Sequence, residues 1–389
     1  MHISRLELLN FRNYERAQLD LNTGITIFVG ANGQGKTNLI EAIGYLATVS
    51  SHRVSTDQPL VLVGAEFAIV RARLSHADRD VLVELQINKN GANRAQLNGN
   101  KTKIHELPRY AKSVLFSPED LAIVRGEPSV RRRVLDELLV QRSPRLLGVL
   151  ADYEKVVRQR NSLLKSSRAH GTSAHLSADL DFWDEHLVAF GSDIIDSRLA
   201  LIEDLRDPIS SAYRELVGTN HGATLRAVLS IDGNGNTDVA QRVAAITPET
   251  DSVLSTADRF RNALVRTQSQ ERDRALTLVG PHRDEVYFEL NGLPTRGYAS
   301  HGESWSFALS IRLASAELLR THSQSGDPVL ILDDVFAELD RSRRERLAEL
   351  ISGFEQVLVT AAVLEDVPPT VPRHLVHIEA GSLVGGQDV

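Results

Sequence analysis

The spacing of apolar and polar positions changes several times along the chain. Short apolar runs at residues 3–9, 17–21 and 25–29 predict three strands. Between residues 60 and 107 apolar and polar residues alternate, with turn residues between the runs, which predicts antiparallel hairpins. Because two strands precede residues 25–29, we expect a mixed sheet rather than a simple doubly wound one.

From residue 128 onward the apolar positions follow the period of a helix. A first helix is expected over residues 128–142, opened by a proline. Apolar stripes over residues 149–164 and 182–213 predict two longer helices that form an arm. We expect a polar turn between them at residues 166–177 and a bend near Pro208.

Strand patterns return in the last third of the chain. Residues 286–290, 329–333 and 357–360 predict strands, and a charged helix is expected over 341–351. The tail that follows is expected to be poor in strands. The whole pattern therefore predicts an α/β protein in three parts, namely residues 1–127, a helical insertion at 128–275, and residues 276–389.

A glycine-rich motif separates the third predicted strand from the helix after it. The motif G-x-x-x-x-G-K-T comprises Gly30, Ala31, Asn32, Gly33, Gln34, Gly35, Lys36 and Thr37. Its glycines let backbone N–H groups surround phosphates, and the helix N-terminus adds partial positive charge. Lys36 suits the β- and γ-phosphates of ATP, and the Thr37 hydroxyl suits Mg²⁺. The alternative is a tight turn that carries a lysine by chance.

Two carboxylates, Asp333 and Asp334, end the apolar run 329–332. Charges at the end of a buried strand are costly unless a cation lies nearby. Asp333 can hold Mg²⁺ together with Thr37, and Asp334 can orient or activate the attacking water. The alternative is a pair of caps for the following helix.

Composition and charge narrow the possible classes. The net charge of −7 argues against a uniformly basic nucleic-acid binder but leaves room for a local basic face. The absence of cysteine excludes disulfides and thiolate chemistry. The N-terminus lacks a signal-peptide pattern, and no apolar run is long enough to span a membrane. We therefore expect a cytoplasmic protein without membrane partners.

Six further motifs accompany the phosphate loop along nearly the whole chain, and the last of them contains the acidic strand end. They are Asn10-Phe11-Arg12-Asn13-Tyr14, Phe116-Ser117-Pro118-Glu119-Asp120-Leu121, Arg131-Arg132-Arg133-Val134-Leu135-Asp136, Gly280-Pro281-His282-Arg283-Asp284, Tyr298-Ala299-Ser300-His301-Gly302-Glu303 and Asp333-Asp334-Val335-Phe336-Ala337-Glu338-Leu339-Asp340. With these motifs the chain resembles the RecF family of bacterial recombination mediators, which have ATPase heads of the SMC type.

This resemblance implies a fold and a mechanism. The fold would be an ABC-type phosphate-loop ATPase head, with a mixed sheet, an antiparallel β-subdomain and an inserted helical arm. Two heads would close on ATP and Mg²⁺ as a homodimer, with Ser300 and Gly302 contacting the γ-phosphate held by the other protomer. Ser300 precedes a predicted helix, so it can also act as a cap. Arg12 lies where a side chain can approach the nucleotide, although an exposed turn is the alternative.

Four departures from the patterns of related ATPases point to slow hydrolysis. Asp334 stands where many of them have glutamate, and the signature has Glu303 where glutamine is common. Glu119 occupies the region of the usual Q-loop glutamine, and Thr360 lies near the place of the switch histidine. We expect a weak, DNA-stimulated ATPase that acts as a switch.

The resemblance also implies DNA as a partner, double-stranded or gapped, with RecR as a direct partner and RecA loading as the outcome. Candidate phosphate contacts are Lys101, Lys103, Arg109, Lys112, Arg131, Arg132, Arg133, Arg158, Arg160, Lys165 and Arg168. For each one taken singly we favour a solvated position paired with nearby acids, and we expect DNA binding only of the set as a whole.

Three other classes share parts of this sequence pattern. A structural SMC-like head would need a longer arm. A transporter ATPase subunit is disfavoured by the helical insertion and the missing switch histidine. A small-molecule kinase would need an acceptor-pocket motif that the chain does not show.

Overall fold

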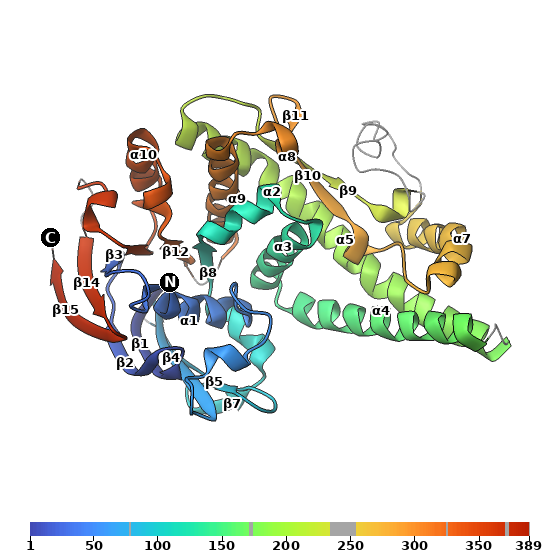
Figure 1. Cartoon of the computed structure of the whole chain (residues 1–389), viewed down its shortest axis with the longest axis horizontal. Helices are drawn as coiled ribbons and strands as arrows, with labels where there is room; N and C mark the ends of the chain where they lie inside the picture. Colours follow the sequence, from blue (N-terminus) through green and yellow to red (C-terminus); the bar gives the residue numbers. More distant parts are fainter. Residues whose placement is uncertain (78, 171–173, 234–253, 324–325, 370–372, 389) are drawn as a thin grey trace. The chain divides into compact units, whose positions relative to one another are not determined.

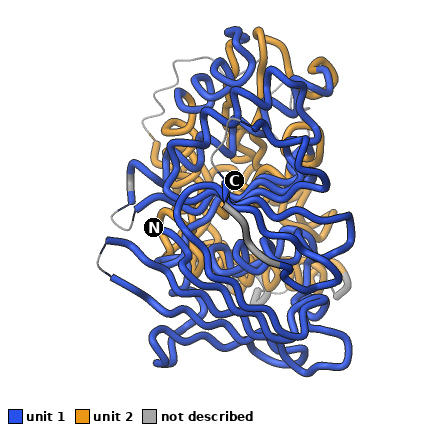
Figure 2. The backbone as a smooth tube through the Cα atoms, turned by 90° about the vertical axis from the view of Figure 1, so that its left-hand side faces the viewer, with its two compact units in different colours: residues 1–121, 207–221, 300–389 blue, residues 122–206, 222–299 orange. Residues whose placement is uncertain are grey.

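The computed structural model describes residues 1–389 except 78, 171–173, 234–253, 324–325, 370–372 and 389 (Figure 1). The chain forms two compact units, and both are discontinuous in sequence (Figure 2). The first comprises Met1–Leu121, Asp207–His221 and Ser300–Val389, and the second comprises Ala122–Arg206 and Gly222–Ala299. The division at residues 127 and 275 expected from the sequence stays a prediction.

The first unit contains a six-stranded sheet in the order β15-β14-β3-β13-β12-β8. Its strands are β3 (Gly24–Val29), β8 (Ser113–Phe116), β12 (Val329–Asp333), β13 (Gln356–Ala361), β14 (Arg373–Glu379) and β15 (Ser382–Asp388). All neighbours are parallel except β14 and β15. Every residue of β12 and β13 is buried, as is typical of central parallel strands, whose apolar runs are continuous.

The second sheet of the first unit is antiparallel, in the order β2-β1-β4-β5-β6-β7. Its strands are β1 (His2–Phe11), β2 (Tyr14–Asp20), β4 (Phe67–His76), β5 (Arg79–Asn88), β6 (Arg94–Leu97) and β7 (Asn100–Thr102). The predicted hairpins are therefore confirmed. β1 pairs with β2 on one side and with β4 on the other, and neither early strand pairs with β3, so it is β15 that makes the other sheet mixed.

Helix α1 (Lys36–Thr48) packs against both sheets of the first unit. Apolar residues of α1, such as Leu39, Ile43 and Leu46, share one buried cluster with Leu6 of β1 and Ile331 of β12. This double contact follows from a helix that is apolar almost all round. The phosphate loop before α1 is thus attached to the main core of the unit.

The C-terminal tail contradicts the expectation that it is poor in strands. β14 pairs with β3 in parallel, and β15 returns beside β14 through the turn at Ala380-Gly381. The apolar run Leu375, Val376 and Ile378 is short and interrupted by His377, which is why its periodicity is weak. Pairing with β3 buries these three residues.

Two further helices complete the first unit. α9 (His301–His322) packs against β8, and α10 (Arg341–Ile351) lies between β12 and β13 in sequence. The charged helix expected over 341–351 is confirmed. Asp340 caps α10 by accepting a hydrogen bond from the Arg343 N–H at 3.0 Å.

The second unit is mainly helical. Its helices are α2 (Leu121–Arg125), α3 (Pro128–Arg142), α4 (Arg145–His170), most of α5 (Ala174–Val217), α7 (Thr256–Arg274) and α8 (Thr295–Tyr298). A small antiparallel sheet has the order β11-β10-β9, with β9 (Thr224–Val228), β10 (Glu285–Leu290) and β11 (Leu293–Pro294). Tyr153, Leu187, Ile194 and Phe260 belong to its buried apolar cluster.

The expected arm differs in detail from the structure. α4 extends to His170 and α5 begins at Ala174, so most of the polar stretch 166–177 is helical. Residues 171–173 of the expected turn lie outside the described residues. α5 contains Pro208 in its interior, and the bend expected near this proline stays a prediction. Tertiary packing of residues such as Leu201, Leu205 and Ile209 stabilises α5 across the proline.

Buried charges connect the helices of the second unit. Arg160 of α4 is only 1% exposed and pairs with Glu271 of α7 at 2.7 Å and Asp184 of α5 at 2.5 Å. Its guanidinium also donates to the Thr277 hydroxyl at 3.0 Å. A charge buried to this extent requires all of its partners, because removing one leaves another uncompensated.

We predict that Arg160→Ala lowers the free energy of unfolding by about 3 kcal/mol, since Glu271 and Asp184 lose their cation. Arg158→Ala is the matched control on the same helix, because Arg158 is exposed and its pair with Glu154 contributes about 0.5 kcal/mol or less. Urea unfolding of both variants, followed by circular dichroism, measures the difference. Equal urea midpoints for the two variants would show that the buried ion pairs of Arg160 contribute no more stability than the exposed pair of Arg158.

Candidate nucleotide-binding site

The phosphate loop runs from the end of β3 at Val29 to the start of α1 at Lys36, as the motif predicted. Gly35 has a φ of 117°, and a Cβ there would lie 2.8 Å from both the Asn13 amide and the Tyr14 hydroxyl. Only glycine is therefore accommodated at this position. The Lys36 amino group donates to the carbonyl oxygens of Gly30 at 2.7 Å and Ala31 at 3.3 Å. This places a buried cation inside the curl of the loop.

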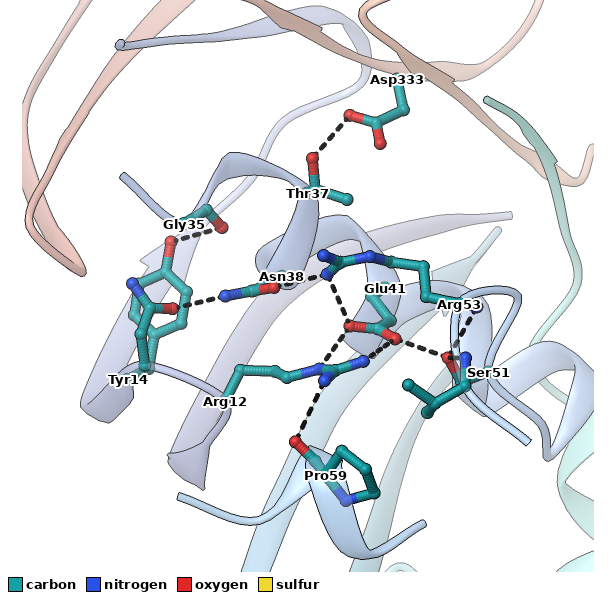
Figure 3. Close-up of polar contacts among 12 residues, drawn as sticks. Arg12, Tyr14, Gly35, Thr37, Asn38, Glu41, Ser51, Arg53, Pro59 and Asp333 are labelled. Atoms are coloured by element: carbon teal, nitrogen blue, oxygen red, sulfur yellow. Dashed lines mark hydrogen bonds and ion pairs between the residues drawn. The ribbon is translucent and has the colours of Figure 1, made fainter. Parts of the chain in front are cut away.

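The N-terminal turn after β1 is attached to α1 by ionic contacts (Figure 3). Arg12 forms a two-pronged pair with Glu41, with distances of 2.8 and 2.6 Å, and also donates to the Pro59 carbonyl oxygen at 3.1 Å. Glu41 is fully buried and also accepts from Ser51 at 2.5 Å and Arg53 at 3.4 Å. Arg12 is thus tied to the helix of the phosphate loop, and its contact with the nucleotide stays a prediction.

Electrostatics account for the ionised state of Glu41 in its buried position. Burial raises the pKa of this carboxyl, but the hydrogen bonds from Arg12 and Ser51 and the charges of Arg12 and Arg53 outweigh it, so the pKa lies below its usual range. Glu41 was not among the residues expected from the sequence. A carboxylate one helical turn after Lys36-Thr37, on an otherwise apolar helix, is the signal that points to it.

The acidic end of β12 lies against the start of α1. The Thr37 hydroxyl donates to Asp333 Oδ1 at 3.1 Å, although the two residues are 296 positions apart in the chain. The Thr360 hydroxyl donates to the same oxygen at 2.5 Å and accepts from the Asp334 N–H at 2.9 Å. Thr360 therefore holds the side chain of Asp333 and the backbone of Asp334. The sequence pointed to Thr360 only as the residue near the missing switch histidine.

Thr37 and Asp333 form a donor set that suits Mg²⁺. A hydroxyl and a carboxylate are the protein oxygens with which Mg²⁺ is usually held beside phosphates. Asp333 is 4% exposed, and its partners among the described residues are the hydroxyls of Thr37 and Thr360 rather than a cation, so its charge is poorly compensated there. Burial raises its pKa to about 6, the charge of Asp334 adds to the rise, and the bonds from Thr360 and Thr37 oppose it. A cation here would stabilise the ionised form.

Asp334 has a backbone conformation that a side chain rarely adopts. Its φ is 51°, in the left-handed region, and its Oδ1 is buried without a hydrogen-bond partner among the described residues. Such strain costs about 1–2 kcal/mol and is typical of functional positions. The unsatisfied oxygen is the kind of acceptor that can orient a water molecule.

Ser300 caps α9, as its position before the helix predicted. Its hydroxyl accepts from the Glu303 N–H at 3.2 Å, and Glu303 in return accepts from the Ser300 N–H at 2.8 Å. This capping box explains why glutamate is suitable at the last position of the signature. Gly302 faces Arg343 of α10, since a Cβ at Gly302 would lie 2.9 Å from the guanidinium. The contact of Ser300 and Gly302 with a partner's phosphate stays a prediction.

The motif after β8 leads to a short 3-10 turn at Pro118–Asp120. Asp120 pairs with Arg312 of α9 at 2.6 Å, which links this turn to the helix that Ser300 caps. Glu119 is exposed, and its charge helps to raise the pKa of Asp333. Its role in place of the Q-loop glutamine stays a prediction.

The structure divides the basic residues expected to contact DNA into buried, half-buried and exposed positions, and Lys112 and Arg132 are half-buried. Arg131 is 4% exposed and pairs with Glu285 at 2.6 Å, and Arg160 is buried in the ion cluster described above. These two therefore leave the candidate set, because paired and buried guanidinium groups cannot reach phosphates. Exposed candidates remain at Lys101, Lys103, Arg109, Arg133, Arg158, Lys165 and Arg168.

None of the described helices is long and apolar enough to cross a membrane.

The phosphate loop after β3, the acidic end of β12, the capped signature helix α9 and the inserted helical unit define an ATPase head of the SMC class. A solved Smc head bound to ScpA shares the fold, with a TM-score of 0.55 at 16% identity. The family model for the RecF/RecN/SMC N terminal domain matches residues 2–367.

Relatives with much higher identity define the family more narrowly. The chain is 59% identical to the DNA replication and repair protein RecF of Clavibacter sepedonicus over 390 residues, covering 99% of this chain and 95% of that protein. It is 54% identical to the RecF of Leifsonia xyli subsp. xyli, covering 99% of both. A solved structure of the recombination mediator RecF-ATP in the RecFOR pathway matches with a TM-score of 0.85 at 29% identity, covering 100% of this chain and 97% of that one. The chain belongs to the RecF family.

We predict that, in the absence of nucleotide and metal, Asp333→Asn raises the free energy of unfolding. Between its ordinary pKa of 3.8 and about 6 the folded state keeps a proton that the unfolded state has lost, so stability falls as pH rises through this window. The variant should gain about 2–3 kcal/mol at pH 7.5 and about half as much at pH 5. Urea unfolding in EDTA at both pH values measures the gain. A gain that does not change with pH would contradict the raised pKa.

Proposed function

We propose that this chain is an ATP-gated DNA-binding protein of replication and recombinational repair. The observation that carries the proposal is the hydrogen bond between Thr37 and Asp333, because it joins the two halves of an ATPase site from opposite ends of the chain. The relatives named as DNA replication and repair proteins and the solved RecF-ATP structure support it. The site thus supports ATP as ligand, and the names of the relatives support DNA as partner.

Each of the described site residues has its own role in this proposal. Lys36 and the backbone N–H groups of the phosphate loop hold the β- and γ-phosphates. Thr37 and Asp333 are the residues that would hold Mg²⁺, which when bound neutralises charge that develops on the transferred phosphoryl group. Asp334 orients the attacking water through its unsatisfied Oδ1. Thr360 holds the backbone of Asp334 in place by accepting from its N–H. We infer slow hydrolysis, because Asp334 is one methylene shorter than glutamate.

ATP also acts as a bridge between two copies of the chain. Ser300 opens the 22-residue helix α9, whose N-terminus attracts an anion. Its hydroxyl accepts from the Glu303 N–H, and its side-chain hydrogen bond with the Glu303 carboxyl lowers the pKa of that carboxyl. When the dimer closes, this hydroxyl would instead donate to a phosphate held by the partner protomer. Hydrolysis removes the γ-phosphate and with it the contact, which makes the weak, DNA-stimulated ATPase a switch.

DNA contact follows dimer closure in this proposal. The exposed candidates would bind the backbone of double-stranded or gapped DNA without base preference and with strong salt dependence. The protein would act in the cytoplasm, with RecR as a direct partner and RecA loading as the result. The solved RecF-ATP structure is described as part of the RecFOR pathway, which supports a partner from that pathway.

We predict that ATP, but not ADP, converts the chain from monomer to dimer and strengthens its affinity for gapped DNA about tenfold or more. Lys36→Ala should abolish both effects, since the buried ammonium group that holds the phosphates is lost. Sedimentation velocity and DNA titration with each nucleotide measure them. If neither the sedimenting mass nor the affinity for DNA changes with the nucleotide added, the gating proposal is refuted.

We predict that Ser300→Asp binds ATP as a monomer but fails to dimerise. Aspartate keeps the helix cap, whereas its charge repels the γ-phosphate of the other protomer. Ser255→Asp is the matched control, because Ser255 caps α7 in the same way. Sedimentation with ATP, alongside ATP affinity of the monomer, separates the two steps. A dimer formed equally by both variants would exclude Ser300 from the interface.

A further inference from the structure

The tip of the phosphate loop is held by a turn from the far end of the chain. The Gln34 carbonyl oxygen accepts from the Gly381 N–H at 2.9 Å, and the Gln34 side-chain Oε1 accepts from the Ala380 N–H at 2.6 Å. Ala380 and Gly381 form the two-residue turn between β14 and β15, closed by the pair Glu379 and Ser382. Gln34 therefore satisfies both N–H groups of this turn.

The turn has the geometry of a tight hairpin and little room for change. Ala380 and Gly381 have φ values of 48° and 73°, which is typical of a type I′ turn. A Cβ at Gly381 would lie 2.9 Å from the Asn13 carbonyl oxygen and 3.2 Å from its amide nitrogen. The Asn13 amide in turn donates to the Gln34 carbonyl at 3.3 Å. The N-terminal and C-terminal turns thus meet on either side of Gln34.

These contacts determine which way the loop's N–H groups point. In a trans peptide the carbonyl oxygen and the following N–H point in opposite directions, and the described chain has no cis peptide. Gly381 and Asn13 hold the Gln34 carbonyl, and the Tyr14 hydroxyl holds the Gly35 carbonyl at 3.0 Å. The N–H groups of Gly35 and Lys36 therefore point away from these donors, as they must to surround a phosphate.

We infer that the turn Ala380-Gly381 is a positioning element of the nucleotide site. It prearranges the phosphate loop, together with Asn13 and Tyr14, so that ATP binds without first ordering the Gln34 and Gly35 peptides. The inference rests on the proposed function, since it assumes that the loop binds ATP. The hairpin β14-β15 would thereby raise the affinity of the site for ATP.

Gly381→Ala tests the inference, because the added Cβ pushes the turn away from Asn13. Gly99→Ala is the matched control. Gly99 follows Asn98 in a two-residue turn with φ values of 48° and 78°, but a Cβ there meets nothing within 4 Å. Both variants place alanine at a similar positive φ, so the difference between their melting temperatures measures what the contact with Asn13 costs in stability. Only Gly381→Ala should weaken ATP binding, by about tenfold, in a calorimetric titration.

Gln34→Ala is a second variant that leaves every glycine in place. It removes the acceptor for the Ala380 N–H but keeps the backbone carbonyl, so ATP affinity should fall about threefold. ATP binding equal to that of Gly99→Ala in both variants would overturn the inference. Failure of the unaltered protein to bind ATP would instead refute the proposed function, and the two failures are thereby distinguished.

Discussion

The parallel register of β3, β13 and β12 is the constraint on which the site depends. It aligns Asp333 with Thr360 and Thr360 with Phe28, so the carboxyl ends of three strands lie in a row. The phosphate loop leaves the first of these strands, and the acidic pair ends the third. The hydrogen bonds from Thr37 and Thr360 to Asp333 exist only because this register brings them together. One slipped residue would turn each side chain to the opposite face.

The site concentrates features that oppose stability. Asp333 is buried with a raised pKa, and Asp334 combines a left-handed backbone with an unsatisfied oxygen. Such costs persist only where the surrounding structure over-determines the geometry. Here the fully buried strands β12 and β13 and the doubly packed helix α1 provide that rigidity. The same rigidity keeps phosphate ligands in place before any nucleotide arrives.

Buried ion pairs of both units have partners that come from distant parts of the sequence. Arg12 and Glu41 join the first turn of the chain to α1, whereas Arg160 joins α4 to α5 and α7. Pairs of this kind contribute specificity more than stability, because a wrong arrangement leaves a buried charge alone. A basic residue that lies near other basic residues in the sequence, such as Arg131 or Arg160, is therefore not evidence of a DNA contact until its burial is known.

Local patterns in the sequence determined much of this protein. A glycine motif between a strand and a helix, an acidic strand end and alternating hairpins are short-range signals, so the phosphate loop, Asp333, Asp334 and the Ser300 cap were predictable. The tertiary structure alone decided which sheet receives β1 and β2 and that the tail forms β14 and β15. It also decided that Arg12 faces Glu41 and that Gly381 meets Gln34. Those contacts join residues far apart in the chain, and no local periodicity encodes a partner that only folding brings near.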